Sequence, residues 1–247
     1  DEAKKTQWIN SEEIQSLHEA NSNLLRHTST APDFVSTDAE IVTLSNVIWS
    51  AAKFHSPRTI TPQNSECLQI LRAATVKRAE KAVANQEEVS SPCMANLAWA
   101  FGHFCWADLP VLTIALSFDK KRQPRLDALD ARHVVSILWS VAKNSSEISR
   151  TMALRRQGDC IALFKPLWRK LHMQLPVCND QDVSNAVWAL HQDDNLENLA
   201  ANDMMDLWRA LAKRANFLVR RHMKRDSLVS VACSFAIVAN SQFNLYA

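Results

Sequence analysis

The feature that most constrains this chain is a short phrase that recurs five times around one aromatic residue. The copies read SNVIWSAA, ANLAWAFG, VSILWSVA, SNAVWALH and VACSFAIV, with aromatics Trp49, Trp99, Trp139, Trp188 and Phe235. Three residues before each aromatic stand Asn46, Asn96, Ser136, Asn185 and Ala232, and one small residue follows it directly. This recurrence predicts several versions of one structural unit.

The spacing inside the phrase fits a helix. The residue three before the aromatic and the small residue after it are four apart, so they share one helix face. A small side chain there lets a neighbouring helix approach, and a buried asparagine amide would tie the helix to adjacent backbone. We therefore interpret nine residues as packing residues that touch no ligand: Asn46, Trp49, Asn96, Trp99, Ser136, Trp139, Asn185, Trp188 and Phe235.

A second helix is predicted before each phrase, at 11–25, 65–82, 109–118, 160–175 and 202–225. The aromatics follow one another after 50, 40, 49 and 47 residues, and two-helix units of this length are typical of α-solenoids. The chain has only two glycines, which disfavours β-rich folds. We expect an all-α protein, an α-solenoid of about five two-helix repeats. Residues 1–36 would form an N-terminal helix and cap, 37–240 the repeats, and 241–247 a C-terminal tail.

The same composition excludes many catalytic sites. With so little glycine, no P-loop, GxGxxG turn or GxSxG elbow can be written. The eight histidines form no HExxH motif and the six cysteines no CxxC pair. The most apolar stretch, 94–118, is interrupted by polar residues and a predicted turn. We expect no enzyme activity, metal, cofactor, small-molecule substrate or membrane span.

Charge is unevenly distributed along the chain. Residues 1–100 carry 9 Lys and Arg against 12 Asp and Glu, whereas residues 101–247 carry 19 against 14. A polyanionic partner would therefore be contacted mainly through the second half. The candidate phosphate-binding residues are Arg209, Lys213, Arg214, Arg220, Arg221, Lys224 and Arg225 on the predicted helix 202–225, Lys120, Lys121, Arg122 and Arg125 in one loop, and Arg155, Arg156, Arg169 and Lys170 in a third group.

Four tryptophans lie outside the repeated phrase: Trp8, Trp106, Trp168 and Trp208. Aromatic side chains of this kind can stack on unpaired bases. Packing between helices is the other interpretation, and the sequence leaves both open.

The wording SNVIWSAAKF, ANLAWAFGHF, VVSILWSVAKN and VSNAVWALHQ resembles the second helix of octotricopeptide repeats, as found in RAP-type proteins of organelles. The similarity spans roughly residues 37–240. It implies an RNA-binding α-solenoid, for which we expect a right-handed superhelix, in mitochondria or, alternatively, plastids. Family repeats are nearer forty residues long, and here Ser136 replaces asparagine while the last copy lacks both Asn and Trp. These departures favour contacts with the RNA backbone over base-by-base reading.

Three functional hypotheses follow. The first is a structural subunit of a mitochondrial ribosome that holds rRNA. The second is a free factor for maturation, stability or translation of one organellar transcript. The third is a protein-binding scaffold in another organellar complex. All three involve neighbouring proteins or RNA rather than catalysis.

Overall fold

The protein is helical throughout the part of the chain that its computed structural model describes: residues 40–55, 60, 62–108, 128–146, 160–192 and 201–244, with a few positions between 19 and 27. The helices are α3 (Ile41–Phe54), α4 (Pro62–Ala84), α5 (Ser91–His103), α8 (Ala131–Lys143), α10 (Cys160–Gln174), the short 3-10 helix η2 (Leu175–Val177), α11 (Asp180–Gln192), α12 (Ala201–Val219) and α13 (Arg225–Asn244). No strand occurs in these ranges. The all-α prediction is confirmed.

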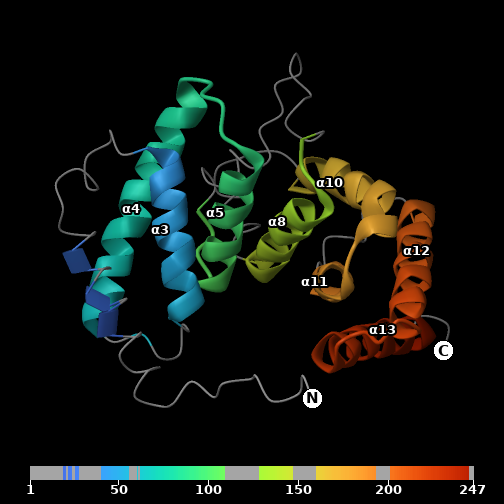
Figure 1. Ribbon diagram of the computed structural model, residues 1–247. Helices are drawn as coiled ribbons and strands as arrows, with labels where there is room; N and C mark the ends of the chain where they lie inside the picture. Colours follow the sequence, from blue (N-terminus) through green and yellow to red (C-terminus); the bar gives the residue numbers. More distant parts are fainter. Residues whose placement is uncertain are drawn as a thin grey trace.

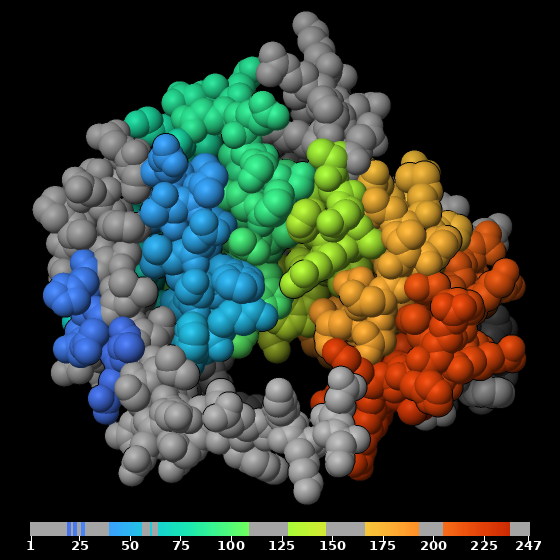
Figure 2. All heavy atoms as spheres, in the orientation of Figure 1, coloured from blue at the N-terminus to red at the C-terminus, as the bar shows by residue number. Residues whose placement is uncertain are grey.

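Five helices form a row in sequence order. α3 packs on α5, α5 on α8, α8 on α11, and α11 on α13 (Figure 1). Each of these helices carries one copy of the repeated phrase. The colours of Figure 2 run in the same order across this face, from blue to red. We call α3, α5, α8, α11 and α13 the tryptophan row, although its last member has phenylalanine at the aromatic position.

The remaining long helices lie outside the row. α4 and α10 match the helices predicted at 65–82 and 160–175. We expected each outer helix to pair with the phrase that follows it. Instead, α4 packs mainly on α3, α10 on α8, and α12 on α11, so the closest partner is the row helix that precedes each outer helix. The predicted helix 109–118 lies outside the described residues, as does most of 11–25.

The sequence predicted a helix at 202–225, and the predicted end of this helix is wrong. α12 stops at Val219, and a turn follows in which His222 adopts a left-handed backbone with φ of 65°. The Met223 N–H donates to the Leu218 carbonyl at 3.1 Å, which closes the end of the helix. α13 then runs to Asn244, so 241–244 is helix rather than tail.

α5 and α8 approach each other closely at Gly102. A Cβ built on Gly102 would lie 2.8 Å from the Ser140 Cα, closer than real atoms pack. Ser140 is the small residue directly after Trp139, and its equivalents Ala100 and Ala189 are also fully buried. The prediction that a small residue there allows close helix approach is confirmed at Ser140.

Candidate functional site

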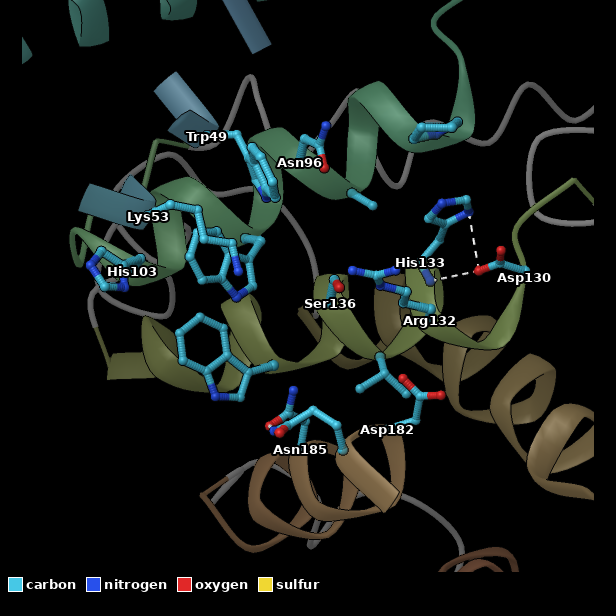
Figure 3. Close-up of a pocket in the computed structure, with 16 residues that line it drawn as sticks. Trp49, Lys53, Asn96, His103, Asp130, Arg132, His133, Ser136, Asp182 and Asn185 are labelled. Atoms are coloured by element: carbon cyan, nitrogen blue, oxygen red, sulfur yellow. Dashed lines mark hydrogen bonds and ion pairs between the residues drawn. The ribbon is translucent and has the colours of Figure 1, made fainter. Parts of the chain in front are cut away.

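A groove of about 680 Å³ lies on the face of the row formed by α3, α5, α8 and α11 (Figure 3). Most of the residues that line it belong to the repeated phrase or to its immediate flanks. They are Trp49, Lys53, Pro92, Ala95, Asn96, Trp99, His103, Asp130, Arg132, His133, Val135, Ser136, Trp139, Gln181, Asp182 and Asn185.

The tryptophans of the row contact one another and form a ladder. Ring centroids are 6.4 Å apart for Trp49 and Trp99, 6.4 Å for Trp99 and Trp139, and 6.0 Å for Trp139 and Trp188. All four side chains are half-buried. The ladder ends at Trp188, because Phe235 packs edge-on against Trp208 at 5.3 Å instead. These rings therefore stabilise contacts between helices, and three of them also line the groove.

Cationic side chains lie over the ladder. Lys53 Nζ is 4.4 Å from the Trp99 ring centre and 5.2 Å from that of Trp49. Lys143 Nζ is 5.7 Å from the Trp188 ring centre. In both cases the lysine, four residues after one tryptophan, reaches the tryptophan of the next row helix. His103 holds the equivalent position in α5, where it stacks on Trp99 at 5.3 Å.

The asparagines are not enclosed in the core, so the prediction of a buried amide is wrong. Asn46 is exposed, and Asn96 and Asn185 are half-buried. Asn96, Asn185 and the equivalent Ser136 line the groove. Asn185 Oδ1 accepts a hydrogen bond from Gln181 Nε2 at 2.8 Å. The side chains one turn before each tryptophan thus present polar atoms beside the aromatic ladder.

The α8–α11 end of the groove carries the acidic groups. The Asp130 carboxylate caps α8 by accepting from the His133 backbone N–H at 2.9 Å. Asp182 and Asn179 cap α11 reciprocally: Asp182 Oδ2 accepts from the Asn179 N–H at 3.0 Å, and Asn179 Oδ1 from the Asp182 N–H at 2.9 Å. Burial raises the pKa of the Asp182 carboxyl, and the Asn179 hydrogen bond only partly opposes this.

Replacing Asp182 by asparagine should stabilise the protein at neutral pH. The wild-type carboxyl has a higher pKa in the folded than in the unfolded state, so the folded state binds more protons between the two values. The protonated carboxyl therefore contributes its full stability at low pH, and this contribution is lost as the pH rises through the folded pKa. Asparagine keeps an oxygen for the Asn179 N–H and carries no charge. Urea unfolding from pH 4 to 8 should show a stability gain that grows with pH.

The matched control for that experiment is Asp206→Asn, at an exposed carboxylate on α12. This variant should follow the pH profile of the wild type. A constant difference between Asp182→Asn and wild type at every pH would contradict the assignment to the buried carboxyl.

The basic residues predicted on 202–225 do not form one face, because α12 ends before Arg220. Arg209 pairs with Asp206 at 3.0 Å, and both side chains are exposed. Lys213, Arg220, Arg221, Lys224 and Arg225 are exposed, and so is Arg169 on α10, whereas Lys170 is half-buried. None of these cations lines the groove. Lys120, Lys121, Arg122, Arg125, Arg155 and Arg156 lie outside the described residues.

Arg214 is different, because its guanidinium is used inside the fold. Its Nε and Nη2 donate to the Cys178 carbonyl at 2.9 and 2.6 Å, which ties α12 to the connection before α11. Replacing Arg214 by alanine should lower the free energy of unfolding by about 2–3 kcal/mol, since charge-assisted hydrogen bonds to a partly buried carbonyl are lost. Arg209→Ala should change it by less than about 0.5 kcal/mol. Equal losses in chemical unfolding would refute this distinction.

Two of the four separate tryptophans are packing residues. Trp168 is 4% exposed and Trp106 is 8% exposed. Trp106 packs on Phe101 and Phe104. Because the Trp106 and Trp168 side chains are both buried, neither is available to stack on a base. Trp208 is half-buried against Phe235. Trp8 lies outside the described residues.

Comparison of the chain with protein-family models, curated proteins and solved structures finds no match. Within the described ranges, no three histidine, cysteine, aspartate or glutamate side chains are placed to hold a metal ion. Nor is any helix there long and apolar enough to span a bilayer. The groove therefore has to be interpreted from its own residues.

Sequence reasoning missed Lys53, His103 and Arg132, which line the groove, and Lys143, which lies over Trp188 at the end of the ladder. A signal for three of them was present. The residue four after the aromatic is Lys53, His103 and Lys143 in the first three copies, and Gln192 in the fourth. Aromatic faces, cations and amides side by side can stack on bases, neutralise phosphates and hydrogen-bond to base edges.

Proposed function

We propose that this protein is an α-solenoid that binds single-stranded RNA without catalysis, and that the strand lies along the groove of the tryptophan row. The observation that carries the proposal is the ladder of half-buried tryptophans with a lysine over it at both ends. Stacking platforms beside cations are the usual means of holding an unpaired strand. The ordered packing of row helices supports the solenoid.

The arrangement of charge suggests where the strand lies. Lys53 and Lys143 are near the indoles, whereas two carboxylates, Asp130 and Asp182, lie with the single arginine Arg132 at the far side of the groove (Figure 3). Phosphates are attracted to the lysines and repelled by the carboxylates, so the backbone follows the tryptophan side. The polar atoms of Asn96, Ser136 and Asn185 then face the bases.

An unpaired strand fits this chemistry better than a duplex. In an RNA helix the bases are stacked on one another, and their faces are not free to meet an indole. The protein would therefore bind exposed loops, bulges or ends of a structured RNA. Such segments occur in ribosomal RNA, and we propose a mitochondrial ribosome as the setting, with rRNA rather than mRNA as the partner. The resemblance to octotricopeptide repeats supports this setting.

The test of RNA binding uses the full chain after nuclease treatment. Fluorescence anisotropy with a labelled single strand and with the same strand in a duplex should show preference for the single strand. Its affinity should fall as salt rises, because phosphate contacts release counterions. Intrinsic tryptophan fluorescence should be quenched on binding. No binding, or stronger binding of the duplex without quenching, would refute the proposal.

The setting needs a separate experiment. The tagged protein is captured from an organelle extract, one half is treated with RNase, and both RNA and protein are identified. Discrete rRNA with ribosomal proteins supports the ribosomal role, and a single enriched messenger or precursor RNA indicates a maturation factor. A protein complex that is unchanged by RNase and contains no RNA indicates a scaffold.

A further inference from the structure

The last helix of the tryptophan row has an apolar face that is exposed among the residues that the structure describes. In α13, the Val229 side chain is 55% exposed and the Ile237 side chain 48% exposed. Cys233 and Ala236 between them are also exposed. Spacings of four, three and one place these four residues on one side of the helix. We call Val229, Cys233, Ala236 and Ile237 the α13 stripe.

The equivalent positions are buried in α5, α8 and α11, the row helices that have a row neighbour on each side. When Phe235 is aligned with the tryptophans, Cys233, Ala236 and Ile237 correspond to Leu97, Ala100 and Phe101 in α5. The matching residues of α8 are Ile137, Ser140 and Val141, and those of α11 are Ala186, Ala189 and Leu190. All nine are at most 4% exposed. Among the described row helices, α13 leaves all three positions exposed, whereas α3 at the other end of the row has Val47 and Ser50 half-buried and Ala51 buried.

The α13 stripe also lacks the polar character of a solvated end. From Ser227 to Asn244 the helix contains no charged residue. Stacks of helical units that end in water need a polar outer face, and exposed apolar patches usually mark interaction sites. The absence of charge also makes this face unsuited to RNA.

We propose that the α13 stripe is the contact surface of a homodimer, formed by two antiparallel α13 helices related by a two-fold axis near Cys233. A two-fold interface requires a self-complementary surface, and the stripe is symmetric in this sense. Val229 lies four residues before Cys233 and Ile237 four after it. Val229 of one copy therefore packs against Ile237 of the second copy.

Two further features suit this pairing. Cys233 and Ala236 are small, so the two helix axes can come close at the centre of the contact. Antiparallel helices also place the positive end of one dipole beside the negative end of the other. The only charged residues of α13, Arg225 and Asp226, lie at its start, away from the two-fold axis. A contact of one helix pair is small, so the dimer should dissociate in the micromolar range.

The first test is sedimentation velocity of the nuclease-treated full chain from about 1 to 100 µM, which brackets a micromolar dissociation constant. We expect a monomer–dimer equilibrium. Val229→Asp and Ile237→Asp should each raise the dissociation constant at least about tenfold, because a carboxylate is buried at the contact. Met173→Asp, at a 71% exposed position of α10, is the matched control and should leave it unchanged. Circular dichroism checks that each variant is folded.

The second test needs no change within the stripe. Cys233 is a free, exposed thiol. In a chain with Cys105→Ser and Cys160→Ser, a short bismaleimide should join two copies through Cys233, and Cys233→Ser should abolish the product. A monomer at every concentration, a dimer that persists in both aspartate variants, or no cross-link would overturn the proposal. None of these readouts depends on RNA.

Discussion

Replacing Lys53 and Lys143 together by glutamate should weaken binding of single-stranded RNA by roughly a hundredfold. Lys53 lies over an indole that lines the groove, and Lys143 lies over Trp188, the last indole of the ladder, so each can meet a phosphate. Loss of one charge-assisted contact costs about 1.5 kcal/mol or more, which corresponds to about tenfold per site. Anisotropy titrations at one salt concentration give the change in affinity.

A salt titration of the same variant identifies the cause. Each phosphate contact with a single strand contributes about 0.7 to the slope of log affinity against log salt, so two lost contacts make the slope shallower by about 1.4. Lys77→Glu, at an exposed lysine of α4 outside the groove, is the control and should preserve the wild-type slope. Thermal unfolding of all variants excludes loss of the fold as the reason.

The basic residues of α12 provide a rival interface. If RNA binds there, Lys213→Glu combined with Arg220→Glu should cause the larger loss of affinity, while the Lys53 and Lys143 variant stays near wild type. That outcome would place the RNA on the outer side of α12 and contradict the groove.

The second large effect is on stability, at Gly102. A Cβ there would lie 2.8 Å from both Ser140 Cα and Oγ, and the Cα belongs to the backbone of α8. Alanine favours a helix over glycine by about 1 kcal/mol, but overpacking a tight interface costs about 1–3 kcal/mol. Because one of the clashing atoms is backbone and cannot move aside cheaply, the cost lies in the upper part of that range, and we expect Gly102→Ala to lower the free energy of unfolding by about 1–2 kcal/mol. Gly102→Leu should lower it by more than about 3 kcal/mol, because α5 and α8 must separate.

Ser140→Gly provides the control for this clash. It removes two of the three atoms that a new Cβ would meet, but the Ser140 Cα remains at 2.8 Å. Combined with Gly102→Ala, it should therefore recover only part of the lost stability in a double-mutant cycle. Additive losses in urea unfolding would show that the two residues do not interact.

Much of the fold could be predicted because the signals are local. The recurring phrase, with its aromatic and its small neighbour, identifies α3, α5, α8 and α11 by spacing alone. The end of α12 was missed because α12 stops at a turn through His222, a residue type that gives no stop signal comparable to glycine or proline. The role of Arg214 depends on the carbonyl of Cys178, 36 residues away, which no pattern in the sequence specifies.

The candidate site shows the same division between local and long-range information. The tryptophans and asparagines were visible in the sequence, but a helical phrase alone does not tell which of its faces stays open. The positions of Lys53 and Lys143 have meaning only when the next row helix is in place, because each lysine reaches the tryptophan of that neighbour. The groove is a property of adjacent copies, so one copy read by itself could not reveal it.

The packing of each outer helix on the row helix before it has a consequence for engineering this protein. A unit that can be moved as a whole begins with a row helix and ends with the outer helix that covers it, as α3 does with α4 and α11 with α12. Whole units should therefore be inserted or removed at the short connections between an outer helix and the next row helix, which are 85–90, 175–179 and 220–224. A unit inserted at one of them should add one tryptophan to the ladder and, if the proposed function holds, lengthen the RNA strand that is bound. A cut between α3 and α4 would divide a unit in two.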